Sequence, residues 1–236
     1  GGGPDLFDMD RPLTGHSGER PASLVANAPH DARQGADFLD PASTAGWPVA
    51  KPDFRPGPAL LFERCAGVTI RDVSIVDMPA WTVSLVDSAD VAVRDVTIDN
   101  HLRIPNCDGI AIDGSRDVRI TGCAITSADD AVTPQVDRSE TACENVTVSN
   151  CTLRTNACGV KIGSETDGDV RNLTVSNCTI TGSNRGVGIQ HRDGGDVENV
   201  LFSDLVIETR LVPGPWWGKA EPIYVTSLAR DGDTTL

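Results

Sequence analysis

The chain has 236 residues, a formal net charge of −14 and an aromatic content of only 4%. That length suits one or two domains, and the negative charge would repel a polyanion, which argues against a nucleic-acid partner. No apolar run approaches the roughly 20 residues that a membrane-spanning helix needs, so no membrane partner is expected either.

The first 57 residues are rich in Gly, Pro, Asp and Ala, and eight prolines would interrupt any long helix or central strand. We expect residues 1–57 to form an irregular segment packed on the rest of the chain, with at most one short strand and a weak helical pattern at 32–39. The chain opens with Gly-Gly-Gly-Pro-Asp and without an initiator Met, which indicates a mature or trimmed product and favours a secreted or periplasmic protein.

From Leu60 onward, pairs of short apolar segments recur every 23–28 residues, and the second segment of each pair starts five residues after the first. The first segments are 68–70, 91–93, 118–120, 146–148, 173–175 and 200–202. A further segment precedes the later pairs, at 81–85, 109–112, 131–133, 159–162 and 186–189. Three strands per repeat predict an all-β solenoid over residues 58–236, a right-handed parallel β-helix of about six to seven coils.

Two repeat positions have a characteristic residue type. The residue before each second segment is one that tolerates a left-handed bend, which predicts a ladder of stacked turns: Asp72, Asp95, Gly122, Asn150, Asn177 and Asp204. Cys123, Cys151 and Cys178 share another position and predict a column of buried thiols. Pairing of Cys65 with Cys107, or of Cys143 with a neighbour, stays open. The cysteine spacing does not suit a zinc site.

Acidic residues precede two equivalent strands on successive coils. Asp108 stands before the segment at 109–112, and Asp129 and Asp130 stand before the segment at 131–133. Because parallel neighbours lie roughly 4.7–4.9 Å apart, the three carboxylates should converge on one surface. Three acids gathered in this way are typical of a sugar-hydrolysing centre. The alternative is that they are turn formers, as expected for Asp117, Asp169 and Asp196.

The motifs Asn106-Cys107-Asp108-Gly109 and Asp129-Asp130-Ala131-Val132 resemble two motifs of the family 28 glycoside hydrolases, the polygalacturonases and rhamnogalacturonan hydrolases. The resemblance extends from about Arg55 to at least Ile189. It implies an inverting, cofactor-free and metal-free hydrolase that acts on a pectic poly- or oligosaccharide as a monomer. Asp129 would be the acid, while Asp108 and Asp130 would hold the attacking water, at the roughly 6.5–9.5 Å separation of an inverting pair.

Two family motifs are altered. Cys158 stands where the family has the His of Gly-His-Gly, and Gly188-Ile189-Gln190 replaces the Arg-Ile-Lys whose cations grip the sugar carboxylate. The resemblance therefore favours a rhamnogalacturonan-type or related glycan over polygalacturonan, which stays open as a substrate. An inactive homologue is the other alternative. The chain is also short for the family, so coils are expected to be missing at both ends.

The candidate substrate-binding residues are Asn106, Lys161, Arg185, Gln190, His191 and Cys158. Lys161 is either a cation of the site or a solvated surface residue, and His191 is either a cleft residue or part of a surface turn. Trp216 and Trp217 belong to the main aromatic cluster, which either forms a sugar platform or seals the solenoid wall. Two further functions remain open on the same fold: a calcium-dependent polysaccharide lyase and a non-catalytic carbohydrate-binding β-helix.

Overall fold

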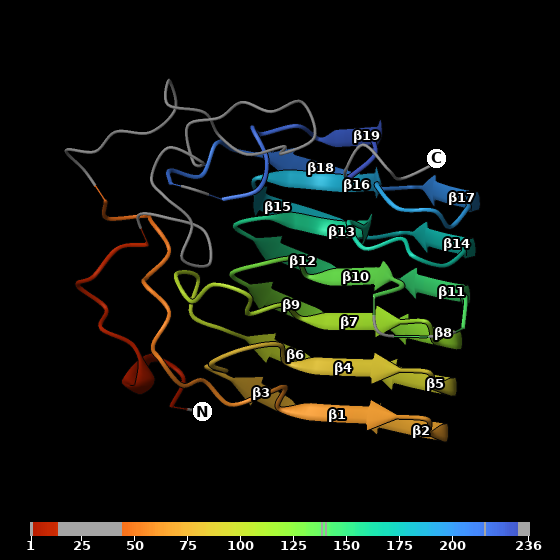
Figure 1. Cartoon of the computed structure of the whole chain (residues 1–236), viewed down its shortest axis with the longest axis horizontal. Helices are drawn as coiled ribbons and strands as arrows, with labels where there is room; N and C mark the ends of the chain where they lie inside the picture. Colours follow the sequence, from red (N-terminus) through yellow and green to blue (C-terminus); the bar gives the residue numbers. More distant parts are fainter. Residues whose placement is uncertain (1, 14–43, 138, 140, 215, 231–236) are drawn as a thin grey trace.

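The computed structural model describes residues 2–13, 44–137, 139, 141–214 and 216–230. These residues form a solenoid of three parallel sheets (Figure 1). The first sheet contains β1 (Leu60–Glu63), β4 (Val83–Val86), β7 (Ile110–Asp113), β10 (Val132–Gln135), β13 (Cys158–Gly163), β16 (Arg185–His191) and β19 (Ile223–Ser227). The second contains β2 (Ala66–Arg71), β5 (Ala89–Arg94), β8 (Arg116–Thr121), β11 (Cys143–Ser149), β14 (Val170–Ser176) and β17 (Val197–Ser203). The third contains β3 (Ser74–Val76), β6 (Thr97–Asp99), β9 (Ala124–Ser127), β12 (Thr152–Thr155), β15 (Thr179–Ser183) and β18 (Val206–Thr209).

Each strand pairs with the strand one coil earlier and the strand one coil later. Val118 of β8, for example, is in register with Val91 on one side and with Val146 on the other. Equivalent repeat positions therefore stack on top of one another, and the interior becomes a set of continuous apolar columns. The expected parallel β-solenoid with three strands per coil is confirmed.

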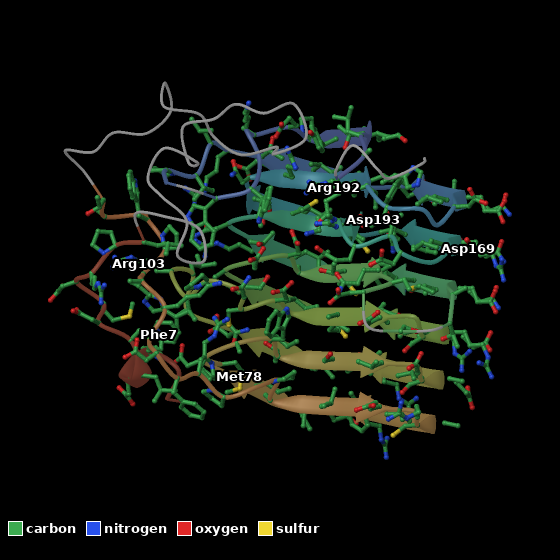
Figure 2. All side chains as sticks on the ribbon, in the orientation of Figure 1. Phe7, Met78, Arg103, Asp169, Arg192 and Asp193 are labelled. Atoms are coloured by element: carbon green, nitrogen blue, oxygen red, sulfur yellow. The ribbon has the colours of Figure 1, made fainter. Side chains whose placement is uncertain are left out.

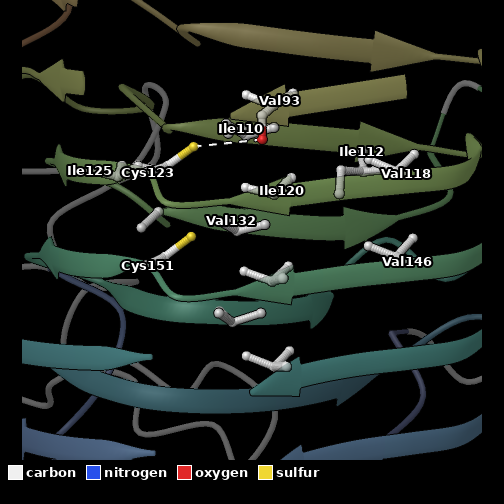
Figure 3. Packing of buried hydrophobic residues seen from close by; sticks show 14 of the residues in the cluster. Val93, Ile110, Ile112, Val118, Ile120, Cys123, Ile125, Val132, Val146 and Cys151 are labelled. Atoms are coloured by element: carbon white, nitrogen blue, oxygen red, sulfur yellow. Dashed lines mark hydrogen bonds between the residues drawn. The ribbon is translucent and has the colours of Figure 1, made fainter. Parts of the chain in front are cut away.

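The core lies inside the coil, where buried aliphatic side chains from all three sheets meet (Figure 3). Cys123, Cys151 and Cys178 are at most 2% exposed and belong to this core, which confirms the predicted thiol column. The Cys123 thiol donates to the carbonyl of Val93 at 3.8 Å. All seven cysteines are free thiols in the structure, so neither of the disulfides left open by the sequence is formed.

The turns follow the predicted ladder. All six residues at the turn position have positive φ angles, between 51° and 66°, and Asn177 donates to the side chain of Asn150 at 2.6 Å. A second ladder, which the repeat pattern did not predict, runs along the second sheet. There Asn145 donates to Asp117, Asn172 to Asn145 and Asn199 to Asn172, each at 3.1 Å.

The described part of the N-terminal segment contains a 3₁₀ helix, η1 (Pro4–Leu6), and an antiparallel bridge between Pro12 and Val49. It packs beside the solenoid: Phe7 and Val49 join a second apolar cluster with Ile104 and Trp216, and Met78 packs against this cluster (Figure 2). The helical pattern expected at 32–39 lies outside the described residues. In the described part of the chain, no helix is long and apolar enough to span a bilayer.

Candidate active site

The three acids meet where the chain enters the first sheet. Ile110 of β7 is in register with Val132 of β10, so Asp108 and Asp130 occupy the same place on neighbouring coils. One carboxylate oxygen each from Asp108, Asp129 and Asp130 lies within 4.8 Å of the other two. The side chains are buried, with 7%, 9% and 1% of their surface exposed. The predicted convergence of the acids is therefore observed.

Backbone geometry, rather than strand alternation, points Asp129 and Asp130 to one place. Both precede β10, so the alternation of side chains along a strand does not apply to them. Asp129 accepts a hydrogen bond from the backbone N–H of Asp130 at 3.1 Å, and Ser127 donates to the Asp129 carbonyl at 2.7 Å. The N–H of Cys158, one coil later, donates to Asp130 Oδ1 at 3.0 Å.

Asp108 has the least compensated carboxyl group of the three. Its Oδ1 is buried and has no hydrogen-bond partner among the described residues. Burial raises the pKa of Asp108 well above its usual range, and the charges of Asp129 and Asp130 raise it further. The cluster therefore holds at least one proton at pH values where an isolated aspartic acid would be ionised.

Lys161 is the cation inside this cluster. Its Nζ forms an ion pair with Asp130 Oδ2, and its side chain is only 11% exposed. Burial opposes the charge on Lys161, but the carboxylates of Asp130, Glu165 and Asp129 outweigh burial and raise its pKa. Burial raises the pKa of Asp130 as well, and Lys161 counteracts that increase. Lys161 is therefore part of the site and not a solvated surface residue.

The acids open into a cleft of about 350 Å³ on the outer face of the first sheet. The lining is predominantly polar and carries two indole side chains: Pro58, Trp81, Ser84, Asn106, Asp108, Ala111, Asp113, Asp129, Asp130, Gln135, Asp137, Lys161, Ser164, Glu165 and Trp217. Several of these occupy alternate strand positions, opposite the buried Ile110 and Ile112. That alternation is the sequence signal that would have found Ser84, Ala111, Asp113 and Gln135.

Arg55 is a second cation close to the acids, and no sequence motif assigned it to the site. Its guanidinium donates to Asn106 Oδ1 at 3.2 Å and to the carbonyl of Pro105, and it lies 5.8 Å from the ring centroid of Trp81. Arg55 thereby holds the loop that carries Asn106 and Asp108. Because Arg55 lies outside the repeat, no periodic signal marks it.

Four of the predicted substrate-binding residues do not line the cleft. Cys158 is 1% exposed and its thiol donates to the carbonyl of Val160, so only its backbone serves the site. Arg185 is also 1% exposed, pairs with Glu221 at 3.1 Å through two nitrogens and lies 3.5 Å from the Tyr224 ring centroid.

The other two lie further along β16. Gln190 is 3% exposed and pairs in register with Gly163. His191 contacts Ser227 Oγ at 3.0 Å and the carbonyl of Gly195 at 2.7 Å, beside a separate cavity of about 250 Å³ between β16, β17 and β19.

The two neighbouring tryptophans divide the roles left open by the sequence. Trp216 is 3% exposed, belongs to the second apolar cluster and donates its indole N–H to the carbonyl of Gly46 at 3.2 Å. Trp217 lines the cleft. Trp216 therefore packs in the apolar cluster beside the solenoid, and Trp217 lies at the cleft where a ligand would bind.

A parallel β-solenoid with three buried carboxyl groups at the floor of an open cleft has the architecture and acid set of a glycan-cleaving protein. The sequence profile of "Glycosyl hydrolases family 28" matches residues 34–212. The chain belongs to glycosyl hydrolase family 28.

Three known proteins are similar to parts of this chain. A "probable polygalacturonase" of Vitis vinifera is 36% identical over 67 residues, which are 28% of this chain and 14% of the relative. A hyperthermoactive exopolygalacturonase of Thermotoga maritima superposes with a TM-score of 0.60 and 27% identity, over 66% of this chain and 39% of that one. A polygalacturonase of Erwinia carotovora ssp. carotovora gives a TM-score of 0.49 and 21% identity, over 71% of this chain and 56% of that one. The chain thus spans well under two thirds of each relative.

Proposed function

We propose that this chain hydrolyses a pectic poly- or oligosaccharide by a single inverting displacement, with a rhamnogalacturonan-type or related glycan as substrate rather than polygalacturonan. The observation that carries the proposal is the cluster of three buried carboxyl groups, one of them with a strongly raised pKa, at the floor of the cleft. Glycoside cleavage requires a protonated carboxyl group and an ionised one at the same bond. Membership of glycosyl hydrolase family 28 supports the same reaction class.

In this proposal Asp129 protonates the leaving oxygen, and Asp108 and Asp130 hold the attacking water. Two hydrogen bonds of about 2.7 Å let one water bridge oxygens up to about 5.4 Å apart, and the observed limit of 4.8 Å lies within that reach. The Lys161 ammonium favours an ionised Asp130, which then removes the proton from the water. Asp129 gives one proton to the leaving oxygen and Asp130 takes one from the water, so the acid cluster holds the same number of protons after each turnover.

The stereochemistry of the product tests the inverting mechanism. Carboxyl groups about 5–5.5 Å apart are typical of retaining enzymes, and wider pairs are typical of inverting ones. Inversion remains our proposal because a third carboxyl group gives the water two holders beside the acid. Proton NMR of the first-formed anomer distinguishes the two outcomes, and retention would contradict the mechanism.

The substrate proposal rests on what faces the cleft. Gly188 has no side chain, Ile189 packs against the core and Gln190 is buried, so the positions that correspond to the family's carboxylate-gripping cations offer no charge. A glycan in which neutral sugars alternate with uronates places fewer carboxylates against this surface than polygalacturonan does.

The experiment is a comparison of rhamnogalacturonan and polygalacturonan oligosaccharides by reducing-end release, with wild type and Asp129→Asn. We expect cleavage of the former by wild type, loss of at least about 100-fold in the variant, and no effect of a chelator. An unsaturated, ultraviolet-absorbing product that requires calcium would instead indicate a lyase. Unchanged behaviour of Asp129→Asn would indicate a non-catalytic binding module.

A further inference from the structure

We propose that the cleft selects a glycan with an uncharged unit, either a neutral sugar or an esterified uronate, on at least one side of the cleavage point, and discriminates against a chain of free uronates. The inference rests on the proposed function, because it concerns the ligand of the same cleft. It goes further by making charge, and not only sugar identity, the selected property.

The charge of the cleft lining is strongly one-sided. Six of the lining residues are acidic and one is basic: Asp108, Asp113, Asp129, Asp130, Asp137 and Glu165 against Lys161. Acidic groups therefore outnumber basic groups in the lining by five. A cleft lined by one sign of charge concentrates the field and repels a ligand of the same sign.

Four cations of the described residues, one in the cleft lining and three outside it, are engaged by protein groups. Lys161 is held by Asp130, and Arg55 by Asn106 and the Pro105 carbonyl beside the charges of the acid cluster. Arg230, near Glu165, donates to both carboxylate oxygens of Asp193 at 2.7 and 2.9 Å. Arg185 is buried in its pair with Glu221. A sugar carboxylate in the cleft would therefore compete with a protein carboxylate or amide for any of these cations.

What the cleft does offer suits an uncharged sugar. Trp81 and Trp217 present indole side chains, which stack on the C–H faces of sugar rings whatever the charge of the ligand. Ser84, Asn106 and Gln135 provide neutral hydrogen-bonding groups. Asp108 Oδ1, which is buried and has no hydrogen-bond partner among the described residues, lies in the same lining and requires a donor such as a sugar hydroxyl or a water.

The test uses two probes that differ in charge: an oligogalacturonide and the same oligosaccharide fully methyl-esterified. Binding to the Asp129→Asn variant is measured by intrinsic tryptophan fluorescence, and hydrolysis is measured with wild type. Salt is varied from about 0.01 M to about 1 M, which shortens the Debye length from about 30 Å to about 3 Å. We expect the ester to bind at least about tenfold more tightly at low salt, and the difference to shrink at high salt as the free acid gains affinity.

A charge variant with a matched control sharpens the test. Glu165→Gln removes one negative charge from the lining and should narrow the preference for the ester severalfold. Glu208→Gln makes the same change on an exposed position of β18 in the third sheet and should leave the preference unchanged.

Equal or tighter binding of the free acid, binding of neither probe, or an equal effect of the two variants would overturn the inference. If the ester is bound selectively but not cleaved, charge selection stands and the hydrolase proposal fails for this linkage. If wild type cleaves the free acid faster than the ester, the hydrolase proposal stands and the inference fails.

Discussion

The ammonium group of Lys161 contacts a carboxylate oxygen of Asp130, and the two side chains are only 11% and 1% exposed. The pair joins β13 to the residue that precedes β10, one coil away. Removing one partner from a buried ion pair leaves an uncompensated charge, which is the costly case. Lys161 is therefore both a structural contact between coils and the group that favours an ionised Asp130.

Replacing Lys161 by Met should shift the acidic limb of the kcat/KM profile to higher pH. The reason is that Lys161 counteracts the increase that burial imposes on the pKa of Asp130, so without it Asp130 ionises later. The measurement is the pH dependence of hydrolysis of the best glycan substrate. Lys161→Arg preserves the charge and should shift the limb less, and an unshifted profile for Lys161→Met would contradict the role of the pair.

Asp108→Asn should abolish activity and stabilise the fold at neutral pH. The folded-state pKa of Asp108 is raised above the unfolded value of 3.8, so the folded protein binds the extra proton and loses stability as the pH rises above about 4. Asn has no charge to bury, and we expect a gain of about 1–2 kcal/mol at pH 7. Thermal unfolding at pH 7 and at pH 3.5 measures this, because the difference from wild type should disappear at the lower pH.

Arg55→Ala should reduce kcat/KM by about 10-fold or more, because a small displacement of a positioned group is expensive in catalysis. Arg55 donates through two nitrogens to Asn106 and Pro105, next to Asp108. Arg55→Lys should not restore activity, since an ammonium does not reproduce this two-point geometry. Arg119→Ala, which removes an exposed pair with Asp90, serves as the control. Equal activities of the two alanine variants would refute the positioning role.

Replacing Trp216 should mainly lower stability, and replacing Trp217 should mainly weaken substrate binding. Trp216→Ala should cost about 3–5 kcal/mol of unfolding free energy, because its buried indole fills the second apolar cluster. Trp217→Ala should raise KM with a much smaller loss of stability, since Trp217 lines the cleft. Urea unfolding and substrate kinetics on both variants check this. The prediction fails if Trp217→Ala leaves KM unchanged.

The thiol column should accept an aliphatic residue. Cys151 occupies the repeat position held by Val96 one coil before Cys123, and both side chains are at most 2% exposed. Cys151→Val should therefore cost less than about 1.5 kcal/mol. Cys151→Asp places an unpaired carboxyl group in the core and should prevent folding at neutral pH. Urea unfolding of the valine variant and soluble yield of the aspartate variant measure the contrast.

Residues that repeat along the chain lie where their period predicts. The apolar segments, the left-handed turn residues and the cysteine column follow a fixed period, and the convergence of Asp108 with Asp129 and Asp130 follows from the same register. Membership of the first sheet alone did not predict which residues line the cleft. Arg185 and His191 belong to β16 as expected, but Glu221 and Ser227 engage them away from the cleft.

The sequence by itself determined the coil, its interior columns and the meeting of the acids, because local alternation and a constant repeat length dictate which side chains stack. Only the tertiary structure decided which groups surround those acids. Arg55 and Trp217 come from outside the periodic strands, and Lys161 acquires its role through one contact across coils. Such contacts depend on how segments distant in sequence pack together, and no local pattern encodes that packing.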